Sequence, residues 1–376
     1  MKVVTIIGTR PEIIKTSRVM AALDRFTEHV IVHTGQNYDY ELNQLFFETL
    51  EIRKPDYFLE AAGSNAAETI GLIIAKSDEA LARIKPDAVL ILGDTNSSLA
   101  ALSAKRRRIP IFHMEAGNRC FDDRSPEEIN RRIVDHISDI NMPYSSISRE
   151  YLLREGLPQD RIIKTGSPTF EVLNHYLPKI EGSDILGRLD LKPQEYFVVS
   201  CHREENVDDP QQLRKFVELL NQLAAIYGLR MLVSTHPRTR KRLDQLNISL
   251  RPELEFREPL GLFDYVKLEM NAKATLSDSG TISEESSILG FPALTLREIH
   301  ERPEAMEEAV VMMTGLDLEC VLSALKMLEA QSSGERQARR IVPDYNVPNV
   351  SEKVVRIILS YTSYVNRVVW RKAPNQ

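Results

Sequence analysis

Residues 3–20 read VVTIIGTRPEIIKTSRVM, and this stretch indicates the fold class of the chain. The apolar run Val3–Ile7 predicts a buried strand of a parallel sheet, and the segment after Pro11 predicts a helix. A strand, one glycine and a helix start are typical of a nucleotide site. Yet the stretch is neither a G-x-G-x-x-G sequence nor a Walker loop. Arg10, at the mouth of the first helix, therefore has no assigned role in a familiar phosphate loop.

Length and composition favour a two-domain enzyme-sized chain. It has 376 residues, of which 43% are hydrophobic and 27% charged, with a formal net charge of −6. Nucleic acid is therefore not an expected partner. Cys120, Cys201 and Cys320 are widely spaced and odd in number, which argues against a disulfide framework or a metal site. No signal peptide or membrane-length apolar run is visible, so we expect a cytoplasmic protein that does not bind membranes.

Strand and helix patterns alternate along the chain. Strands are expected at Val30–His33, Ala88–Leu92, Ile109–His113, Arg161–Lys164, Tyr196–Ser200, Arg230–Ser234, Lys273–Ser277 and Ala293–Leu296. Helices are expected at ranges that include Asn65–Ile84, Glu127–Ile137, Gln211–Tyr227 and Thr281–Leu289. This alternation predicts an α/β fold of right-handed βαβ units, with helices on both faces of parallel sheets.

The division into domains follows from composition. The stretch Leu177–Pro193 is richer in Pro, Gly and charge, and we place an inter-domain linker there. Residues 1–176 and 177–350 are expected to form two doubly wound, Rossmann-like domains facing a central cleft. A last helix, Ser351–Trp370, lies outside the alternation, and we assign the end of the chain, from about 351 to 376, to the N-terminal domain.

Polar residues that look surplus to folding follow the predicted strands. They are Arg10, Asp94, Glu115, His202, Arg203, His236, Asp278, Ser279 and Gly280. All lie on the carboxyl side of a strand, where doubly wound sheets bind ligands. Other interpretations stay open: Asp94 as a helix cap, Glu115 as a solvated loop carboxylate, and Arg131 as part of a solvated helix face. Cys201 and His202 point to opposite faces of an extended segment, so a cysteine nucleophile is not expected.

Three helix starts have the pattern of a capping box, in which a Ser or Thr cap and a Glu three residues later satisfy each other's amides. The pairs are Thr9 with Glu12, Ser125 with Glu128, and Thr281 with Glu284. In this interpretation Arg10, Glu127 and Glu285 are not needed for helix capping and can serve another role. The turn SDSGT, residues 277–281, leads into the third of these helices and suits a phosphate, because backbone amides and the helix dipole favour an anion.

Nine segments match one family in order along nearly the whole chain. They are GTRPEIIK (8–15), GDTNSSLA (93–100), HMEAGNR (113–119), PEEINRR (126–132), TGSP (165–168), HREEN (202–206), THP (235–237), SDSGTISEES (277–286) and ERPEA (301–305). By them the chain closely resembles the non-hydrolysing UDP-N-acetylglucosamine 2-epimerases, whose fold is the two-domain GT-B arrangement. The resemblance implies a cofactor-independent enzyme without a metal. It would eliminate UDP across C-1 and C-2 of the sugar, leave a glycal, and add UDP back with the opposite configuration at C-2.

The same resemblance implies the site residues. Asp94, Glu115 and Glu127 match the catalytic carboxylates, and which of them is the base on each face stays open. His202, Arg10 and the amides at the start of the predicted phosphate turn would stabilise the departing diphosphate. The full set of residues expected to bind substrate or UDP is Arg10, Lys15, Arg131, Pro259, Phe263, Ser279, Gly280, Thr281, Glu285 and Arg302. Within it, Glu285 would hold the ribose hydroxyls, and the uracil would rest near 259–263.

Residues 115–145 and 202–209 look like one branch of the family. That branch converts UDP-2-acetamido-2,6-dideoxy-L-talose to UDP-N-acetyl-L-fucosamine for capsule, O-antigen or lipopolysaccharide synthesis. The loop with Asn118, Cys120 and Phe121 would then meet the methyl group at C-6. Thr281 stands where many members have a glycine, and residues 33–47 lack the Gln-His helix start that is tied to allosteric activation in the glucosamine enzymes.

Three other functions stay open. The first is the parent activity, which interconverts UDP-N-acetylglucosamine and UDP-N-acetylmannosamine. The second is a GT-B glycosyltransferase. The many acidic residues between 94 and 127 favour elimination over simple glycosyl transfer. The third is a non-catalytic sensor of UDP-sugars, which the occupied catalytic positions disfavour. The family also implies a homodimer.

Overall fold

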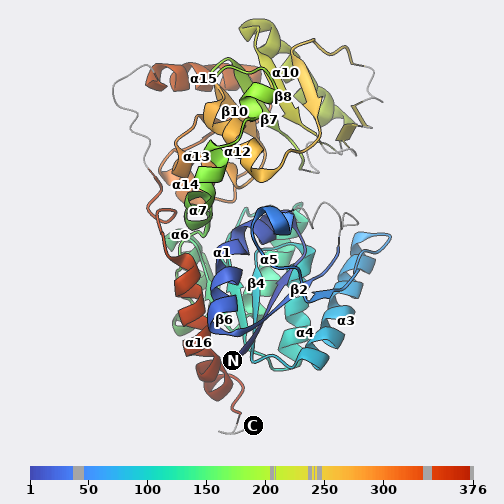
Figure 1. Cartoon of the computed structure of the whole chain (residues 1–376), viewed down its shortest axis with the longest axis vertical. Helices are drawn as coiled ribbons and strands as arrows, with labels where there is room; N and C mark the ends of the chain where they lie inside the picture. Colours follow the sequence, from blue (N-terminus) through green and yellow to red (C-terminus); the bar gives the residue numbers. More distant parts are fainter. Residues whose placement is uncertain are drawn as a thin grey trace. The chain divides into compact units, whose positions relative to one another are not determined.

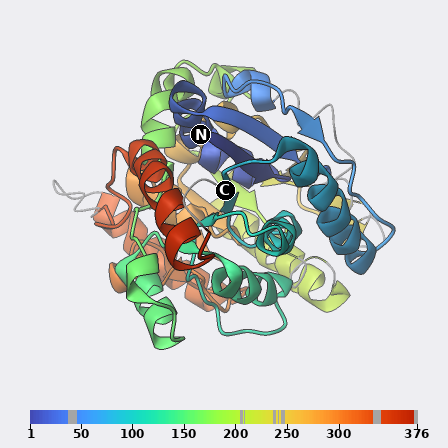
Figure 2. The same cartoon turned by 90° about the horizontal axis from the view of Figure 1, so that it is seen from below.

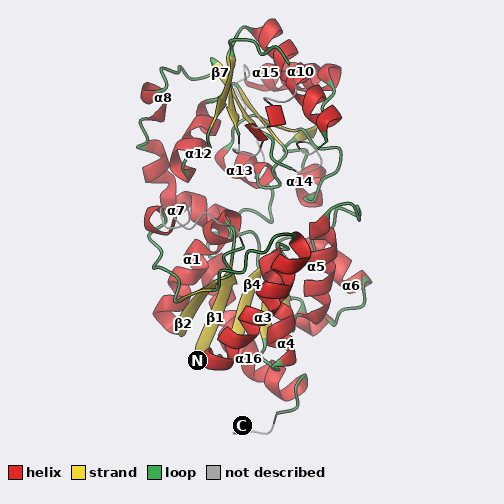
Figure 3. Ribbon diagram, turned by 90° about the vertical axis from the view of Figure 1, so that its right-hand side faces the viewer, coloured by secondary structure: helices red, strands yellow, loops and turns green. Residues whose placement is uncertain are grey.

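A computed structural model describes residues 1–36, 46–203, 207, 209–235, 239–240, 242–243, 248–332 and 341–372. The chain divides into two compact units, Met1–Val172 with Pro343–Gln376, and Leu173–Val342. Each unit is built on a six-stranded sheet with helices packed against it (Figures 1 and 3). The predicted α/β fold is therefore confirmed.

The sheet of the first unit has the strand order β3-β2-β1-β4-β5-β6. Its strands, all parallel, are β1 (Lys2–Ile7), β2 (Glu28–His33), β3 (Tyr57–Phe58), β4 (Ala88–Leu92), β5 (Ile111–Met114) and β6 (Ile140–Met142). Val3–Ile7 and all of β4 are buried, as expected for strands covered on both faces. The strand order reverses between β1 and β4, which makes this pair the switch point of the sheet.

Helices cover both faces of this sheet. They are α1 (Arg10–Phe26), α3 (Ala66–Ile84), η1 (Asn96–Ala100), α4 (Ala101–Arg106), α5 (Pro126–Ile137), α6 (Ser146–Arg154), η2 (Gln159–Arg161) and α16 (Val350–Val368). Val3 packs with Leu23 of α1 and Ile358 of α16, whereas Val4 packs with Ile73 of α3 on the other face. This follows because successive side chains of a strand point to opposite faces. Helix α16 lies along α1, so the end of the chain joins the beginning in one core (Figure 2).

The second unit repeats the same plan. Its sheet has the order β12-β11-β10-β7-β8-β9. The strands are β7 (Tyr196–Ser200), β8 (Arg230–Ser234), β9 (Leu254–Arg257), β10 (Ala274–Ser277), β11 (Ala293–Thr295) and β12 (Met312–Met313). The helices are α8 (Ile185–Arg188), α10 (Pro210–Tyr227), α12 (Leu262–Asn271), α13 (Ile282–Leu289), α14 (Pro303–Glu307) and α15 (Leu318–Ser332). Here the order reverses between β7 and β10, which form the second switch point.

The strand predictions fail mainly at the sheet edges. The short strands β3, β6, β9 and β12 are missed, since two to four residues carry little periodicity. The strand predicted at Arg161–Lys164 is wrong: η2 ends at Arg161, and Ile162 makes only an isolated bridge to Asn141. Strand β5 begins at Ile111 rather than Ile109, after Pro110, which has no N–H to donate to a neighbouring strand.

The predicted linker Leu177–Pro193 is also wrong over most of its length. Helix α7 (Thr169–Glu181) continues through Pro178, and α8 follows it. The chain passes between the two units inside α7. Ile180 and Ile185 are buried, so packing fixes these turns although their composition resembles a linker.

Two absences hold for the described ranges. No helix there is long and apolar enough to cross a membrane. Nor do three or more His, Cys, Asp or Glu side chains in that part of the chain group as metal ligands would.

The core between α1, α16 and the sheet can be tested with two adjacent residues of α16. Ile358 is fully buried and Leu359 is 40% exposed. Ile358→Ala should lower the free energy of unfolding by about 2–5 kcal/mol, because it leaves a cavity. Leu359→Ala should change it by less than about 1 kcal/mol. Urea denaturation of both variants checks this, and equal losses would contradict the placement of α16.

Candidate active site

Four of the predicted site residues follow strands at the switch points of the two sheets. In the first unit, Arg10 follows β1 and Asp94 follows β4. In the second, His202 follows β7 and Ser279 follows β10. Doubly wound sheets bind ligands outside the carboxyl ends of strands where the order reverses. Each unit therefore presents its candidate residues at its own ligand-binding edge.

The turn before α1 is held by Glu12. Of the three predicted capping boxes, this one is present: Oε2 of Glu12 accepts the amides of Gly8 at 2.6 Å and Thr9 at 2.8 Å. The Thr9 hydroxyl contributes less, since it makes no well-formed hydrogen bond. A glycine is required at position 8, because a Cβ there would lie 2.0 Å from Oγ of Ser97.

Arg10 is the first residue of α1, and its guanidinium lies 4.9 Å from the ring centre of Phe46. Among the residues that the structure describes, no carboxylate forms an ion pair with it. The guanidinium is thus held by an aromatic face and keeps its donors for an anion.

Glu12 also ties this turn to the turn that carries Asp94. Its Oε1 accepts the hydroxyl of Thr95 at 2.5 Å. Burial raises the pKa of Glu12 to about 7, although the hydrogen bonds from Thr95, Gly8 and Thr9 oppose the rise. The carboxyl group that joins the two turns therefore titrates near neutral pH.

Asp94 is gripped by Arg131 of α5. Nε and Nη2 of Arg131 donate to Oδ2 of Asp94 at 2.9 and 2.6 Å, and Nη1 donates to Glu128 at 2.8 Å. Arg131 is 2% exposed, so its interpretation as part of a solvated helix face is wrong. The interpretation of Asp94 as a helix cap is wrong too, because Thr95 caps η1 and accepts the amide of Ser97. Arg131 therefore orients the carboxylate of Asp94.

The second predicted capping box does not form. Ser125 is the N-cap of α5, but its hydroxyl bonds to Oε2 of Glu127 at 2.8 Å. Glu128 turns inward and accepts the amide of Cys120 at 3.0 Å and its thiol at 3.3 Å. Burial raises the pKa of Glu128, yet the Cys120 amide and Arg131 outweigh burial and lower it. Glu127 remains half-buried at the helix start, where it can act on a ligand.

Glu115 forms a nearly buried ion pair with Lys15 of α1. Nζ and Oε2 lie 2.7 Å apart, with the side chains 7% and 10% exposed. Asn118 donates to the other oxygen of Glu115 at 3.3 Å, and the Lys15 ammonium lies 5.6 Å from the ring centre of Tyr144. Glu115 follows β5 with a left-handed φ of +62°, an uncommon conformation for a residue with a Cβ. Its interpretation as a solvated loop carboxylate is therefore wrong.

In the second unit, His202 is oriented by the buried Asp278. The amide of His202 donates to Asp278 at 3.0 Å, and its Nδ1 lies 3.1 Å from Oδ1 of the same carboxylate. The side chain of His202 is 54% exposed, so the imidazole can meet a ligand. Cys201 beside it is buried in the core and points away, as expected.

The third predicted capping box, at the start of α13, is also wrong. Thr281 makes no side-chain cap bond with the amide of Glu284, and its hydroxyl donates to the carboxylate of Glu285 at 3.3 Å. The amides of Ser279 and Thr281 bond to nearby side-chain hydroxyls. The amide of Gly280 has no acceptor among the described residues. It is the donor best placed for a phosphate at this helix start.

Two ion pairs lie near this turn. The sequence pointed to their arginines, Arg203 and Arg302, but not to their carboxylate partners. Arg203, in the HREEN segment, pairs with the nearly buried Glu301 at 3.2 Å. Arg302, 4% exposed, lies 3.6 Å from Glu284. A Cβ on Gly280 would lie 3.5 Å from Glu301 and 4.0 Å from Arg203, so this pair borders the phosphate turn. What pointed to these arginines in the sequence was their position in the segments HREEN and ERPEA.

The residues expected to contact uracil lie near the start of α12. Pro259 is exposed on the loop after β9. Phe263 packs against Tyr176 with ring centres 5.4 Å apart, and Nζ of Lys179 lies 5.8 Å from the centre of the Phe263 ring. His236 lies outside the described residues.

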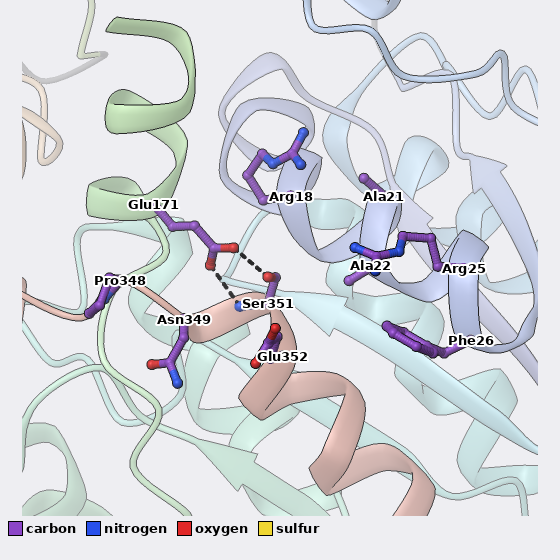
Figure 4. A pocket seen from close by; sticks show the side chains of 10 residues that line it. All are labelled: Arg18, Ala21, Ala22, Arg25, Phe26, Glu171, Pro348, Asn349, Ser351 and Glu352. Atoms are coloured by element: carbon purple, nitrogen blue, oxygen red, sulfur yellow. Dashed lines mark hydrogen bonds between the residues drawn. The ribbon is translucent and has the colours of Figure 1, made fainter.

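A cavity of about 160 Å³ in the first unit is not this site (Figure 4). It is lined by residues of α1, α7 and the start of α16, and none of the predicted site residues borders it. Within it, the carboxylate of Glu171 accepts the amide of Ser351 at 2.8 Å and also its hydroxyl. This contact fixes the first turn of α16.

Comparison with known proteins decides the family. A family model described as UDP-N-acetylglucosamine 2-epimerase matches residues 21–359. The chain belongs to the UDP-N-acetylglucosamine 2-epimerase family. It is therefore an enzyme of the non-hydrolysing, isomerase type, as its resemblance implied.

Similar proteins cover most of its length. A structure of UDP-N-acetylglucosamine 2-epimerase from Rickettsia bellii is 51% identical with a TM-score of 0.92, covering 99% of this chain and 100% of that one. The Methanocaldococcus jannaschii UDP-GlcNAc 2-epimerase, solved in complex with UDP-GlcNAc and UDP, is 33% identical with a TM-score of 0.88, covering 96% and 99%. A Pseudomonas aeruginosa relative, UDP-2,3-diacetamido-2,3-dideoxy-D-glucuronate 2-epimerase, is 33% identical over 87% of this chain and 92% of its own.

The titration of Glu12 gives a pH test. In the unfolded chain Glu12 ionises near pH 4.5, and in the folded protein near 7. Between these values only the folded state holds the proton, so stability falls as pH rises. Glu12→Gln removes the titration. The stability advantage of the wild type over Glu12→Gln should thus shrink by up to about 3 kcal/mol across this interval. Urea denaturation at several pH values checks this, and a constant difference would contradict it.

Proposed function

We propose that the protein inverts C-2 of a UDP-2-acetamido sugar by eliminating UDP to form a glycal and adding it back, without a cofactor. One observation carries the proposal. The carboxyl edge of the first unit presents Asp94, Glu115 and Glu127, and nearly buried cations orient the first two. Membership of the epimerase family supplies the class of substrate.

The carboxylates suit the proton chemistry of such a reaction. The hydrogen on C-2 is not acidified by a carbonyl group, so its removal must accompany departure of the leaving group. One carboxylate takes the proton, and the others offset the developing oxocarbenium charge. The fork of Arg131 and the ammonium of Lys15 keep two carboxylates in fixed orientations, which limits the reorganisation needed in the transition state.

The leaving group is an anion that must be kept for the return step. We assign the diphosphate to the Gly280 amide and the His202 imidazole of the second unit, and by the family resemblance we propose Arg10 as a further UDP-binding residue. Glu285, one turn into α13, is assigned to the ribose hydroxyls, and residues 259–263 to the uracil. Fixed donors of this kind stabilise the departing charge without rearranging.

For the sugar we propose UDP-2-acetamido-2,6-dideoxy-L-talose, giving UDP-N-acetyl-L-fucosamine. The support is the resemblance of residues 115–145 and 202–209 to the branch with this activity. The prediction that Asn118 and Cys120 meet the methyl group at C-6 is wrong. Both side chains are buried and bond within the protein, so they do not face a ligand. Phe121 alone is exposed, at 65%, and packs edge-on against Tyr151.

UDP-N-acetylglucosamine is the second candidate substrate. It is favoured by the names of the Rickettsia bellii and Methanocaldococcus jannaschii proteins, the latter solved with UDP-GlcNAc bound. A role in capsule or O-antigen synthesis, a cytoplasmic location and a homodimer are further proposals that rest on the family resemblance. Light scattering on the purified protein tests the homodimer.

Solvent deuterium incorporation tests the reaction. In heavy water without an acceptor, the product should carry deuterium at C-2, because the proton removed is not the proton returned. NMR or mass spectrometry of the recovered sugar nucleotide measures this for each candidate substrate. Release of UDP without deuterium at C-2 would contradict epimerisation and favour glycosyl transfer or hydrolysis. Turnover of UDP-N-acetylglucosamine but not of the L-talo sugar would exclude the proposed sugar.

Two isosteric variants test the carboxylates. Asp94→Asn and Glu127→Gln should each abolish turnover, because neither amide can accept the proton or offset positive charge. UDP affinity, measured by calorimetry, should stay close to that of the wild type. Asp123→Asn is the control: its side chain is 78% exposed in the same loop region, and turnover should persist. Normal turnover in Asp94→Asn or Glu127→Gln would remove that residue from the catalytic set.

A further inference from the structure

His113 of β5 is a fully buried residue whose ring touches the turn that carries Asp94. Its Nε2 lies 2.8 Å from the carbonyl oxygen of Gly93, the residue before Asp94. Its Nδ1 lies 3.0 Å from Oδ1 of Asp135 on α5, which is also fully buried. The Nδ1 contact is an ion-pair contact and not a hydrogen bond. The ring therefore joins the peptide next to Asp94 to a buried carboxylate.

Asp135 binds the turn that carries Glu115. Its carboxylate accepts the amide of Gly117 at 3.1 Å and Nη1 of Arg119 at 2.7 Å. Arg119 is held in turn by Glu155, through hydrogen bonds of 2.8 and 2.6 Å. Gly117, with a φ of +81°, closes the turn that begins at Glu115. One carboxylate thus anchors the turns of two predicted catalytic residues, one of them through His113.

The contacts of His113 favour its charged form. The Gly93 carbonyl accepts a hydrogen bond at Nε2, and the negative carboxylate of Asp135 lies 3.0 Å from Nδ1, so a ring that is protonated on both nitrogens suits both neighbours. Burial lowers the pKa of His113, but the contact and charge of Asp135 outweigh burial and raise it above its ordinary value, and Asp94 adds to the rise. Burial raises the pKa of Asp135, and His113 and Arg119 more than reverse this. The charged groups around the pair are therefore Asp94, Arg119 and, beyond Arg119, Glu155.

We propose that His113 and Asp135 are positioning residues for Asp94 and Glu115. They form a buried imidazolium–carboxylate pair that fixes both turns and keeps a positive charge next to Asp94. The inference rests on the proposed function, because it concerns carboxylates that act in epimerisation. Since neither side chain is exposed, the pair acts through the Gly93 carbonyl and the Gly117 amide.

The test compares His113→Gln and Asp135→Asn, alone and combined, with Asp139→Asn. Glutamine at 113 can still donate to Gly93 but carries no charge. Asp139 is the matched control: it is 1% exposed, pairs with Lys105 at 2.6 Å, and accepts the amide of Ile111 at 3.0 Å at the opposite end of β5. The measurements are kcat, KM, the pH profile of kcat/KM, UDP affinity and the thermal midpoint.

His113→Gln and Asp135→Asn should each lower kcat by about 100-fold, because small misplacements of reacting groups have effects of this size. UDP affinity should be unchanged. In His113→Gln the acid limb of kcat/KM should move to higher pH, since the carboxylates lose a neighbouring cation. The double variant should be no worse than the more damaged single variant. Asp139→Asn should lower only the thermal midpoint. Unchanged kcat and acid limb in both single variants, or the same changes in Asp139→Asn, would overturn the proposal.

A measurement that needs no turnover separates a failure of the positioning pair from a failure of the proposed function. In ¹⁵N NMR, the ring of His113, assigned by its loss in His113→Gln, should keep two protonated nitrogens at pH values above the ordinary pKa of histidine. A ring that becomes neutral at or below that ordinary value would overturn the positioning pair whatever the activity. If the wild type turns over neither sugar while the ring is doubly protonated, the proposed function fails and the buried imidazolium stands.

Discussion

A carboxylate that loses contact with water needs a fixed cation or hydrogen-bond donors, and this requirement organises the first unit. Asp94 lies on the guanidinium of Arg131, and Glu115 lies on the ammonium of Lys15. The two cations come from α5 and α1. Removing one partner of such a pair costs about 3–5 kcal/mol, because the other charge is left buried. The helices that cover the sheet are therefore also the elements that set the chemistry at its edge.

The second unit handles charge differently. Its exposed candidate, His202, is oriented by one buried carboxylate, and the start of α13 offers the amide of Gly280. Arg203 and Arg302 have carboxylate partners nearby. In the proposed function an anion would be met here mainly by oriented dipoles, which cost less to desolvate than bare charges would. Such a surface suits the diphosphate that is proposed to leave the sugar and return.

Glu12 shows how the two turns of the first switch point depend on each other. One carboxyl group caps α1 and holds Thr95 beside Asp94. The sequence identified the cap, because Thr-x-x-Glu at a helix start is a local pattern. The same pattern failed at Ser125 and Thr281. There Glu128 and Glu284 are drawn into the interior by Arg131 and Arg302, which a local pattern cannot reveal.

The sequence by itself determined the fold class, the central strands and the family. These follow from apolar periodicity and from motifs that are contiguous in the chain, so no knowledge of long-range contacts is needed. Only the tertiary structure decided that Arg131 is buried against Asp94, that Lys15 meets Glu115, and that His113 and Asp135 join their turns. Each pair joins residues tens of positions apart. Which charged side chains meet depends on the spatial order of the parallel strands. That order is a property of the whole sheet rather than of any segment.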